Sequence, residues 1–315
     1  MTGLTKAIIG SRAGSVVRGR KSWRDPQPMC RTATTRSSWI TRALWALIAL
    51  TMAPGIVLAQ EQVLLRLDSP IGESLSYRFE IHLDIAVPPV LGGSQRLESL
   101  MVVQQTTTDA RGDTLYFDAT VREANFSLRS EDGREMLPNV SEDLAGQSFR
   151  TAFTSQGEPV DIQIDGQSPE ASAQVRSALR QAGFPTLPGR PVAVGDRWRD
   201  TLRIRAADMG MAAPGFLVLI NDISLVRLSR SGSATIADLL VETTYEFEPE
   251  AGASSSLSVA VTGSRADNVR FDVTNGHFLS ASGAQDFTMI MTVPSLGSSF
   301  SVHGNGESSA LLIES

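Results

Sequence analysis

The amino-acid sequence predicts a mainly β protein. We expect two similar antiparallel, strongly curved sheets or half-barrels, produced by tandem duplication, with one connecting helix at about 169–182. Long stretches alternate apolar and polar side chains, as strands with one wet face do. Glycine-containing turns separate these stretches. The glycine–acid–aromatic pattern that opens the first long strand, Gly72-Glu73 followed by Tyr77, returns as Gly195-Asp196 followed by Trp198.

The first 60 residues differ in composition from the rest of the chain. They hold nine of the 28 Lys and Arg residues but only one of the 34 acids, so the remainder carries 19 basic and 33 acidic residues, a net charge of −14. An acidic surface repels phosphate backbones, which argues against a nucleic-acid partner. The one cysteine, Cys30, lies in the basic segment, so the rest of the chain can form neither a disulfide nor a thiolate metal site.

Residues 43–59 form an apolar run after Arg36 and Arg42, and it ends in Val57-Leu58-Ala59. This order of charged, apolar and small residues is that of a secretory signal peptide. We therefore predict that residues 1–60 are an N-terminal extension with a signal cleaved near Ala59, which places the protein in the periplasm or outside the cell. An uncleaved signal, retained as an anchor, is the alternative and would be the route of membrane contact.

The first β-rich repeat is predicted at 61–168. Its clearest strand covers residues 75–87, a length that suits a large curved sheet. Arg111-Gly112-Asp113 matches an adhesion tripeptide but stands where a hairpin turn needs glycine, and we interpret it as that turn. The apolar residues change from odd to even positions near Arg122–Ala124, which predicts a bulge. Further strands are expected at about 97–109, 113–129, 146–155 and 158–165.

Residues 169–189 are predicted to form a helix and a linker. Ser168 can cap a helix, Pro169 suits its first position, and Gly183 suits its end. One narrow apolar stripe runs between them, as expected for a helix lying across a sheet.

The second β-rich repeat is predicted at 190–315. Gly195 and Asp196 are interpreted as a structural turn, and Trp198 as a core anchor. Asn275-Gly276 is a strong hairpin signal. The expected strands are at about 197–206, 216–230, 234–248, 255–263, 266–274, 277–293 and 298–313.

The sequence shows no constellation that indicates catalysis, a cofactor or a metal. Its histidines, His82, His277 and His303, are single and far apart, which supports neither a metal site nor a triad. The acids are scattered over outward strand positions. We therefore predict a protein that is not an enzyme, with no catalytic residues, metal or cofactor. A glycosidase-like pair of carboxylates stays open as an alternative, because its two members meet only in space.

The joint between the repeats reads Pro191-Val192-Ala193-Val194-Gly195-Asp196-Arg197-Trp198. With the Tyr-led first strand and the glycine-turn hairpins, it resembles the bacterial secreted and lipoprotein group known as the domain-of-unknown-function 6263 family, over about 61–315. The resemblance implies an exported β protein and assigns no site residues. The plan of long strands plus a helix is more distantly similar to the half-barrel lipoprotein carriers of bacterial envelopes.

These observations lead to one functional hypothesis and its alternatives. A curved sheet has a concave apolar face, and grooves of that kind bind apolar ligands. We expect a non-catalytic envelope protein with an apolar or lipid-like ligand. The alternative is a structural module with filled cores that meets an envelope protein partner, and a carboxylate-based hydrolase is the third hypothesis. The predicted ligand-lining residues are Tyr77, Phe79, Ile81, Leu83, Phe287, Met289 and Met291.

Overall fold

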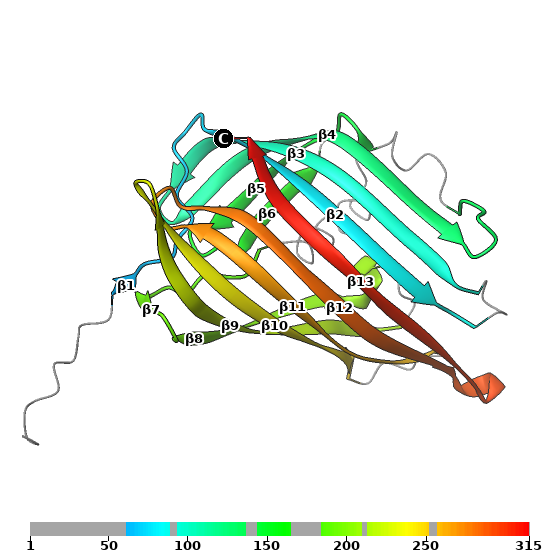
Figure 1. The fold of residues 1–315 in the computed structure, drawn as a ribbon. Coiled ribbons are helices and arrows are strands. Elements are labelled where there is room, and N and C mark those ends of the chain that lie inside the picture. Colours follow the sequence, from blue (N-terminus) through cyan, green and yellow to red (C-terminus); the bar gives the residue numbers. More distant parts are fainter. Residues whose placement is uncertain are drawn as a thin grey trace, which may run out of the picture. The chain divides into compact units, whose positions relative to one another are not determined.

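The computed structural model describes residues 61–88, 93–136, 144–164, 184–209, 213–251 and 257–314. They belong to one structural unit, Leu58–Ser315. The prediction of a mainly β protein is confirmed by an 11-stranded antiparallel sheet and a second sheet of two strands (Figure 1). The predicted signal segment at 1–60 and the predicted helix at 169–182 lie outside the described residues.

Most strands of the large sheet are long. They are β2 (Ser74–Ala86), β3 (Gln95–Arg111), β4 (Thr114–Ser130), β5 (Ser148–Thr154), β6 (Pro159–Ile164), β8 (Arg197–Arg205), β9 (Gly215–Ser231), β10 (Ala234–Pro249), β11 (Ser258–Asp272), β12 (His277–Val293) and β13 (Ser298–Glu314). The small sheet pairs β1 (Gln62–Val63) with β7 (Val192–Ala193). Two short 3-10 helices are η2 (Ala206–Met209) and η3 (Pro294–Leu296).

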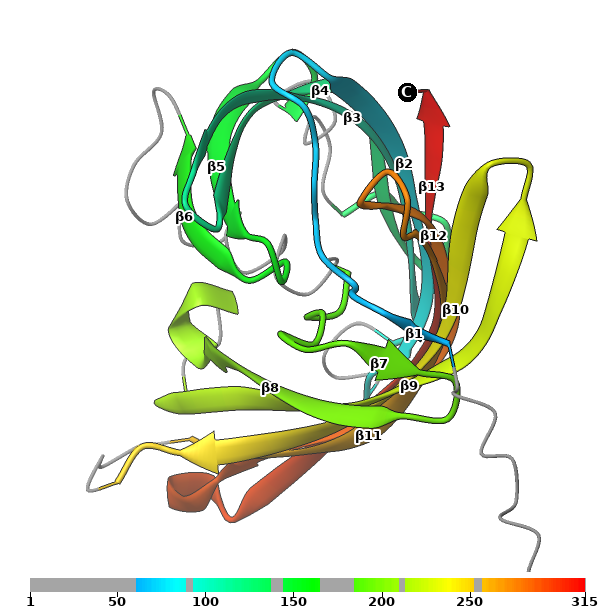
Figure 2. The ribbon, with the colours of Figure 1, turned by 90° about the vertical axis from the view of Figure 1, so that its left-hand side faces the viewer.

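The large sheet corrects the expectation of two separate sheets. Its order is β6-β5-β4-β3-β2-β13-β12-β11-β10-β9-β8, so strands from both halves of the chain join through one pairing, β13 with β2. That pairing joins residues more than 200 positions apart in the sequence. No pattern within a single stretch of the sequence predicts it. The sheet curls around a concave face but is not a closed barrel, since β6 and β8 are its two edges (Figure 2).

The first half of the chain enters the sheet through a glycine turn. Gly72, at φ 90°, donates its backbone N–H to the carbonyl of Thr107 at 2.8 Å. Thr107 in return donates to the carbonyl of Glu73 at 2.9 Å, while Glu73 donates to that of Pro70 at 3.0 Å. Directly afterwards, Thr108 is skipped in the β3–β4 register, which makes it a bulge.

The second half enters through the same arrangement. Gly195, at φ 93°, donates to the carbonyl of Leu225 at 2.8 Å, and Leu225 donates to that of Asp196 at 3.1 Å. Asp196 donates to the carbonyl of Ala193 at 2.9 Å, and Val226 is skipped in the β9–β10 register. The two halves therefore share a turn, a pair of reciprocal hydrogen bonds and a bulge next to that pair.

Two local predictions along the strands have different outcomes. The predicted bulge near Arg122 is confirmed, since Val102 pairs with Glu123 and Val103 with Val121, which leaves Arg122 without a partner position. The separate strands expected at 255–263 and 266–274 are wrong, because β11 runs through both. Gly263, the last residue of the first expected strand, remains paired with Phe287 in the β11–β12 ladder.

Two extended segments, residues 61–70 and 184–196, cross the concave side of the sheet at the end where β11 turns into β12 (Figure 2). We call them the strap. Leu65, Leu187 and Val192 of the strap are almost fully buried. They share one core cluster with residues of the large sheet. The largest fully buried side chains among these sheet residues are Ile223, Leu225, Leu239, Val269 and Phe271.

Backbone hydrogen bonds hold the strap to the turns at this end of the sheet. Leu67 donates to the carbonyl of Ser155 at 2.7 Å, Asp68 to that of Gly276 at 2.9 Å, and Leu187 to that of Gln156 at 2.7 Å. The Trp198 indole N–H of β8 donates to the carbonyl of Thr186 at 2.9 Å. These bonds satisfy backbone groups that would otherwise be buried unpaired, so the strap closes one end of the concave face.

Replacing Leu65 with Ala should destabilise the protein by about 2–5 kcal/mol, because the side chain is wholly buried and its removal leaves a cavity. The adjacent Leu64 is 44% exposed, and Leu64→Ala should cost less than about 0.5 kcal/mol. Urea unfolding of both variants measures the difference. Equal losses would contradict the packing described for the strap.

Gly72→Ala and Gly195→Ala should each cost about 1–2 kcal/mol, because both glycines have positive φ and an added Cβ would otherwise meet open space. The penalty is therefore one of backbone conformation and should be similar for both variants. Thermal unfolding measures it, and a large cost at only one of the two sites would show that the two turns are not equivalent.

Candidate functional site

The candidate site is the concave face of the large sheet beyond the strap. Ile81 and Leu83 of β2 and Phe287, Met289 and Met291 of β12 lie on this face and are half-buried. One strand, β13, runs between the two columns. The strap core ends on β12 with Phe278 and Ala281, so the later β12 residues lie outside that cluster.

Glycines on β13 bring the two apolar columns together. Gly304 pairs with Ile85 on one side and Phe287 on the other, and Gly306 pairs with Leu83 and Gln285. Neither glycine has a positive φ, so what requires glycine at position 304 is space. A Cβ on Gly304 would collide with the Phe287 ring, which therefore lies over this strand.

Three of the seven predicted lining residues pack in or against core clusters, and one of them, Phe287, packs against the cluster of Ile204, Leu217, Leu219 and Tyr245. Tyr77 is buried at 5% exposure, and its hydroxyl donates to the carbonyl of Phe278 at 3.0 Å. Its ring also packs on Phe184 of the strap, 5.6 Å between centroids. Burial, and then the charge of Glu73, raise the Tyr77 pKa above its usual range. Phe79 packs against the core cluster of Val103, Ala119, Val121 and Phe149.

The turn and anchor residues lie at the strap. The Asp196 carboxylate accepts a hydrogen bond from the Ala193 backbone N–H at 3.1 Å, within the turn from Ala193 to Asp196 that contains Gly195. Trp198 is half-buried against the strap core. All three residues organise the entry to β8, at a distance along the chain from the apolar columns.

Polar residues that the sequence analysis did not single out form a band across the concave face. We call Asn221, Thr243, Arg265, Asp267 and Gln285 the polar belt. They lie on four neighbouring strands, and the register pairs Asn221 with Thr243, Thr243 with Arg265 and Arg265 with Gln285. The Thr243 hydroxyl donates to the Asn221 side-chain oxygen at 2.7 Å.

The charged members of the belt form a buried ion pair. Arg265 Nε donates to Asp267 Oδ2 at 2.6 Å, and the two side chains are 20% and 8% exposed. Gly283 faces this pair across the β11–β12 ladder, and a Cβ there would collide with Asp267 Oδ1. Glycine is therefore needed at 283 for the carboxylate to lie flat on the sheet.

Tyr245 borders the belt on the side away from the strap. Its ring belongs to the apolar cluster of Ile204, Leu217 and Leu219, while its hydroxyl donates to Gln285 Oε1 at 3.3 Å. Burial raises the pKa of this hydroxyl, and the positive charge of Arg265 opposes that rise. The hydroxyl is therefore a neutral donor at physiological pH.

The belt divides the concave face into two apolar zones. Along β11, Phe271 and Val269 belong to the strap core, Asp267 and Arg265 follow, and Val261 then packs with the Tyr245 cluster. The same sequence of core, polar and apolar positions occurs on β9, β10 and β12. The half-buried Phe287, Met289 and Met291 lie in the second zone, on the far side of the belt from the strap.

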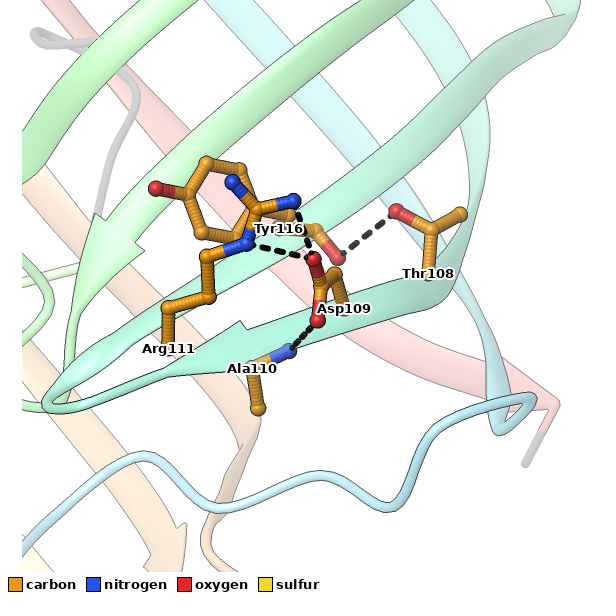
Figure 3. A network of polar contacts seen from close by, with 5 residues as sticks. All are labelled: Thr108, Asp109, Ala110, Arg111 and Tyr116. Atoms are coloured by element: carbon orange, nitrogen blue, oxygen red, sulfur yellow. Dashed lines mark hydrogen bonds and ion pairs between the residues drawn. The ribbon is translucent and has the colours of Figure 1, made fainter.

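The Arg111-Gly112-Asp113 tripeptide lies in the β3–β4 hairpin turn, as interpreted from the sequence. Arg111 Nε donates to Asp109 Oδ2 at 2.7 Å, and its guanidinium lies 5.2 Å from the centre of the Tyr116 ring (Figure 3). Asp109 also accepts from the Ala110 backbone N–H at 2.8 Å. These contacts stabilise the hairpin end itself.

Other parts of the chain offer weaker candidates. His82 and His303 lie exposed on strands, whereas His277 is buried at the start of β12. An open depression of about 360 Å³ at the turn after β4 is lined by Ser130, Glu131, Asp132 and Arg134, a polar lining unsuited to an apolar ligand. Among the residues described, no three His, Cys, Asp or Glu side chains are placed to hold a metal ion.

The chain was compared with protein-family models and with curated proteins. No family model matches it, and no curated protein is significantly similar to it. The resemblance to the secreted and lipoprotein family thus remains a prediction. Within the described ranges, no helix has both the length and the apolar character needed to cross a bilayer.

The polar belt is expected to contribute little net stability. Arg265→Met should cost about 3 kcal/mol, because it leaves the Asp267 carboxylate buried without its counter-charge. The double variant Arg265→Met with Asp267→Leu should have a free energy of unfolding close to that of the wild type, since apolar pairs commonly replace buried ion pairs without loss of stability. Urea unfolding of the single and double variants checks this. A double variant less stable than the single one would make the belt a structural requirement.

Proposed function

We propose that this chain is a non-catalytic exported envelope protein that binds an apolar or lipid-like ligand on its concave sheet face. One observation carries the proposal. The strap core fills the concave face only as far as Ala281 on β12, and the residues beyond the polar belt, including Phe287, Met289 and Met291, keep part of their apolar surface exposed.

The chemistry of this second zone suits an apolar guest. Each square ångström of apolar surface removed from water contributes about 25 cal/mol. When an alkyl chain lies on half-buried Phe and Met side chains, the surface of the chain and the surface of the side chains are both removed from water, and both contribute to the binding free energy. Met side chains adapt to irregular shapes, because three rotatable bonds and a polarisable sulfur let them repack. Leu83 and Ile85 on β2 extend the zone across Gly306 and Gly304.

The proposed setting rests on the sequence and on the shared turn geometry. The signal-like segment before Ala59 supports export, with the mature protein in the periplasm or outside the cell. The matching turns at Gly72 and Gly195, each followed by a bulge beside the hydrogen-bonded partner, support a tandem duplication of two half-barrel units. The connecting helix at 169–182 remains part of this proposal.

Native mass spectrometry of protein purified from its own cell envelope tests the proposal. A lipid-like molecule retained at fixed stoichiometry, and extracted by organic solvent, is the expected result. Repeated absence of any bound molecule, together with co-purification of one envelope protein, would favour the alternative of an interaction module whose faces are filled.

Met289→Asp should weaken binding of an apolar fluorescent probe at least about tenfold, because a carboxylate would have to be desolvated in the apolar zone. Ile290→Asp is the matched control, since Ile290 is the next residue on β12, points to the opposite face and is 44% exposed. Probe titration of both variants, with thermal unfolding to verify folding, gives the comparison. Equal affinities would place the probe somewhere other than the concave face.

A further inference from the structure

The polar belt holds a buried hydrogen-bond acceptor that the described part of the chain leaves unused. Asp267 is 6% exposed, and its Oδ2 accepts from Arg265, but no described residue donates to Oδ1. A buried carboxylate oxygen without a donor is costly, more so than a neutral acceptor. Oδ1 lies against Gly283 on the concave face, in the space that a side chain at position 283 would need.

The charges at this point are already balanced. Arg265 and Asp267 form a close pair, so the belt carries no net charge that would draw an ion. A ligand carboxylate would meet the Asp267 oxygen as a second negative charge and would have no proton to give it. A ligand hydroxyl or amide N–H would supply the missing donor.

The belt also provides hydrogen-bond donors for an acceptor oxygen of the same ligand group. The Tyr245 hydroxyl donates its hydrogen bond to Gln285 Oε1, and this leaves the Gln285 amide N–H groups and the Arg265 guanidinium beside Asp267 on neighbouring strands. These side chains can donate to a carbonyl or hydroxyl oxygen. The belt therefore offers an acceptor and donors side by side, a pattern that matches an uncharged group with both functions.

The apolar zone begins directly beside the belt. On the concave face of β12, Gln285 of the belt is followed by Phe287, Met289 and Met291. At roughly 3.3 Å per residue, Gln285 to Met291 spans about 20 Å, enough for an extended acyl chain. The strap core blocks the opposite direction, since Phe278 and Ala281 are packed in it.

We propose that the polar belt is the head-group site for a lipid with one long apolar chain and an uncharged head bearing a hydroxyl or amide N–H. The head group donates to Asp267 Oδ1, accepts from Gln285 or Arg265, and directs the chain along Phe287, Met289 and Met291. This inference rests on the proposed function, because it specifies the ligand of the same concave face.

Three probes with the same chain and different heads test the inference on the wild-type protein. Monooleoylglycerol donates and accepts, methyl oleate only accepts, and oleate is anionic. Displacement of a bound fluorescent apolar probe, below the aggregation concentration of each lipid, gives the three affinities. We expect monooleoylglycerol to bind about tenfold more tightly than methyl oleate, the size of one hydrogen bond to a buried charged group. Oleate should bind most weakly.

The variant Asp267→Asn should change the order of the three lipid affinities. It keeps the size of the side chain but leaves the charge of Arg265 unbalanced, so oleate should gain about tenfold relative to monooleoylglycerol. Asp286→Asn is the control, because Asp286 is exposed on the other face of β12, next to Gln285. It should leave all three affinities unchanged. Circular dichroism and thermal unfolding establish that both variants fold.

The outcomes distinguish a failure of the head-group inference from a failure of the proposed binding function. If none of the three lipids displaces the probe from the wild type, the proposed binding function itself is overturned. If all three bind with equal affinity, apolar binding stands and the head-group site is overturned, with Asp267 Oδ1 hydrated instead. Preference for oleate by the wild type would also overturn the head-group inference, whether or not Asp267→Asn folds.

Discussion

The pairing of β13 with β2 is the constraint on which the rest of the structure depends. Without it, the strands before and after residues 184–196 would be two meanders, each with an additional unpaired edge. Eleven consecutive and near-consecutive residue pairs, from His303–Ala86 to Glu314–Ser76, join them into one curled sheet. Because β2 and β13 are central, the apolar columns of β2 and β12 come within one strand of each other. The concave face that could hold a ligand is a product of this one long-range pairing.

The curvature of the large sheet explains why the strap is needed. A sheet with free edges at β6 and β8 exposes the concave apolar side chains at the end of the β11–β12 turn, and Leu65, Leu187 and Val192 cover them. The strap can do so as extended chain because its backbone groups bond to the turns at Ser155, Gln156 and Gly276. Each of these turns lies at the same end of the sheet, so the covering is confined there. The far zone around Phe287 keeps a different environment, with less of its apolar surface buried.

Local features were predictable from the sequence, and long-range ones were not. Strand β12 has the bounds expected from alternation, and the bulge at Arg122 follows from a change of face that is visible in the residues. The strap was missed because β1 and β7 have two residues each, too few for a periodic pattern. The belt was missed because two strands were expected at 255–263 and 266–274, which left Arg265 in neither of them. Read as one strand, residues 259–271 alternate throughout, and Arg265 and Asp267 then occupy positions of the apolar face, a signal that could have identified them.

The belt also sets how far an apolar guest can travel along the concave face. Val241 and Val269 occupy the adjacent position on their strands, so apolar side chains fit this part of the sheet. Continued apolar residues at 243, 265 and 267 would merge the strap core with the outer zone and give a guest no preferred position. Polar side chains there interrupt the apolar surface at a fixed level, because an alkyl chain that crossed them would desolvate Arg265 and Asp267 without offering a hydrogen bond. A chain of the proposed kind therefore stops at the belt with its head group, and its position along β12 is set by the register of four strands.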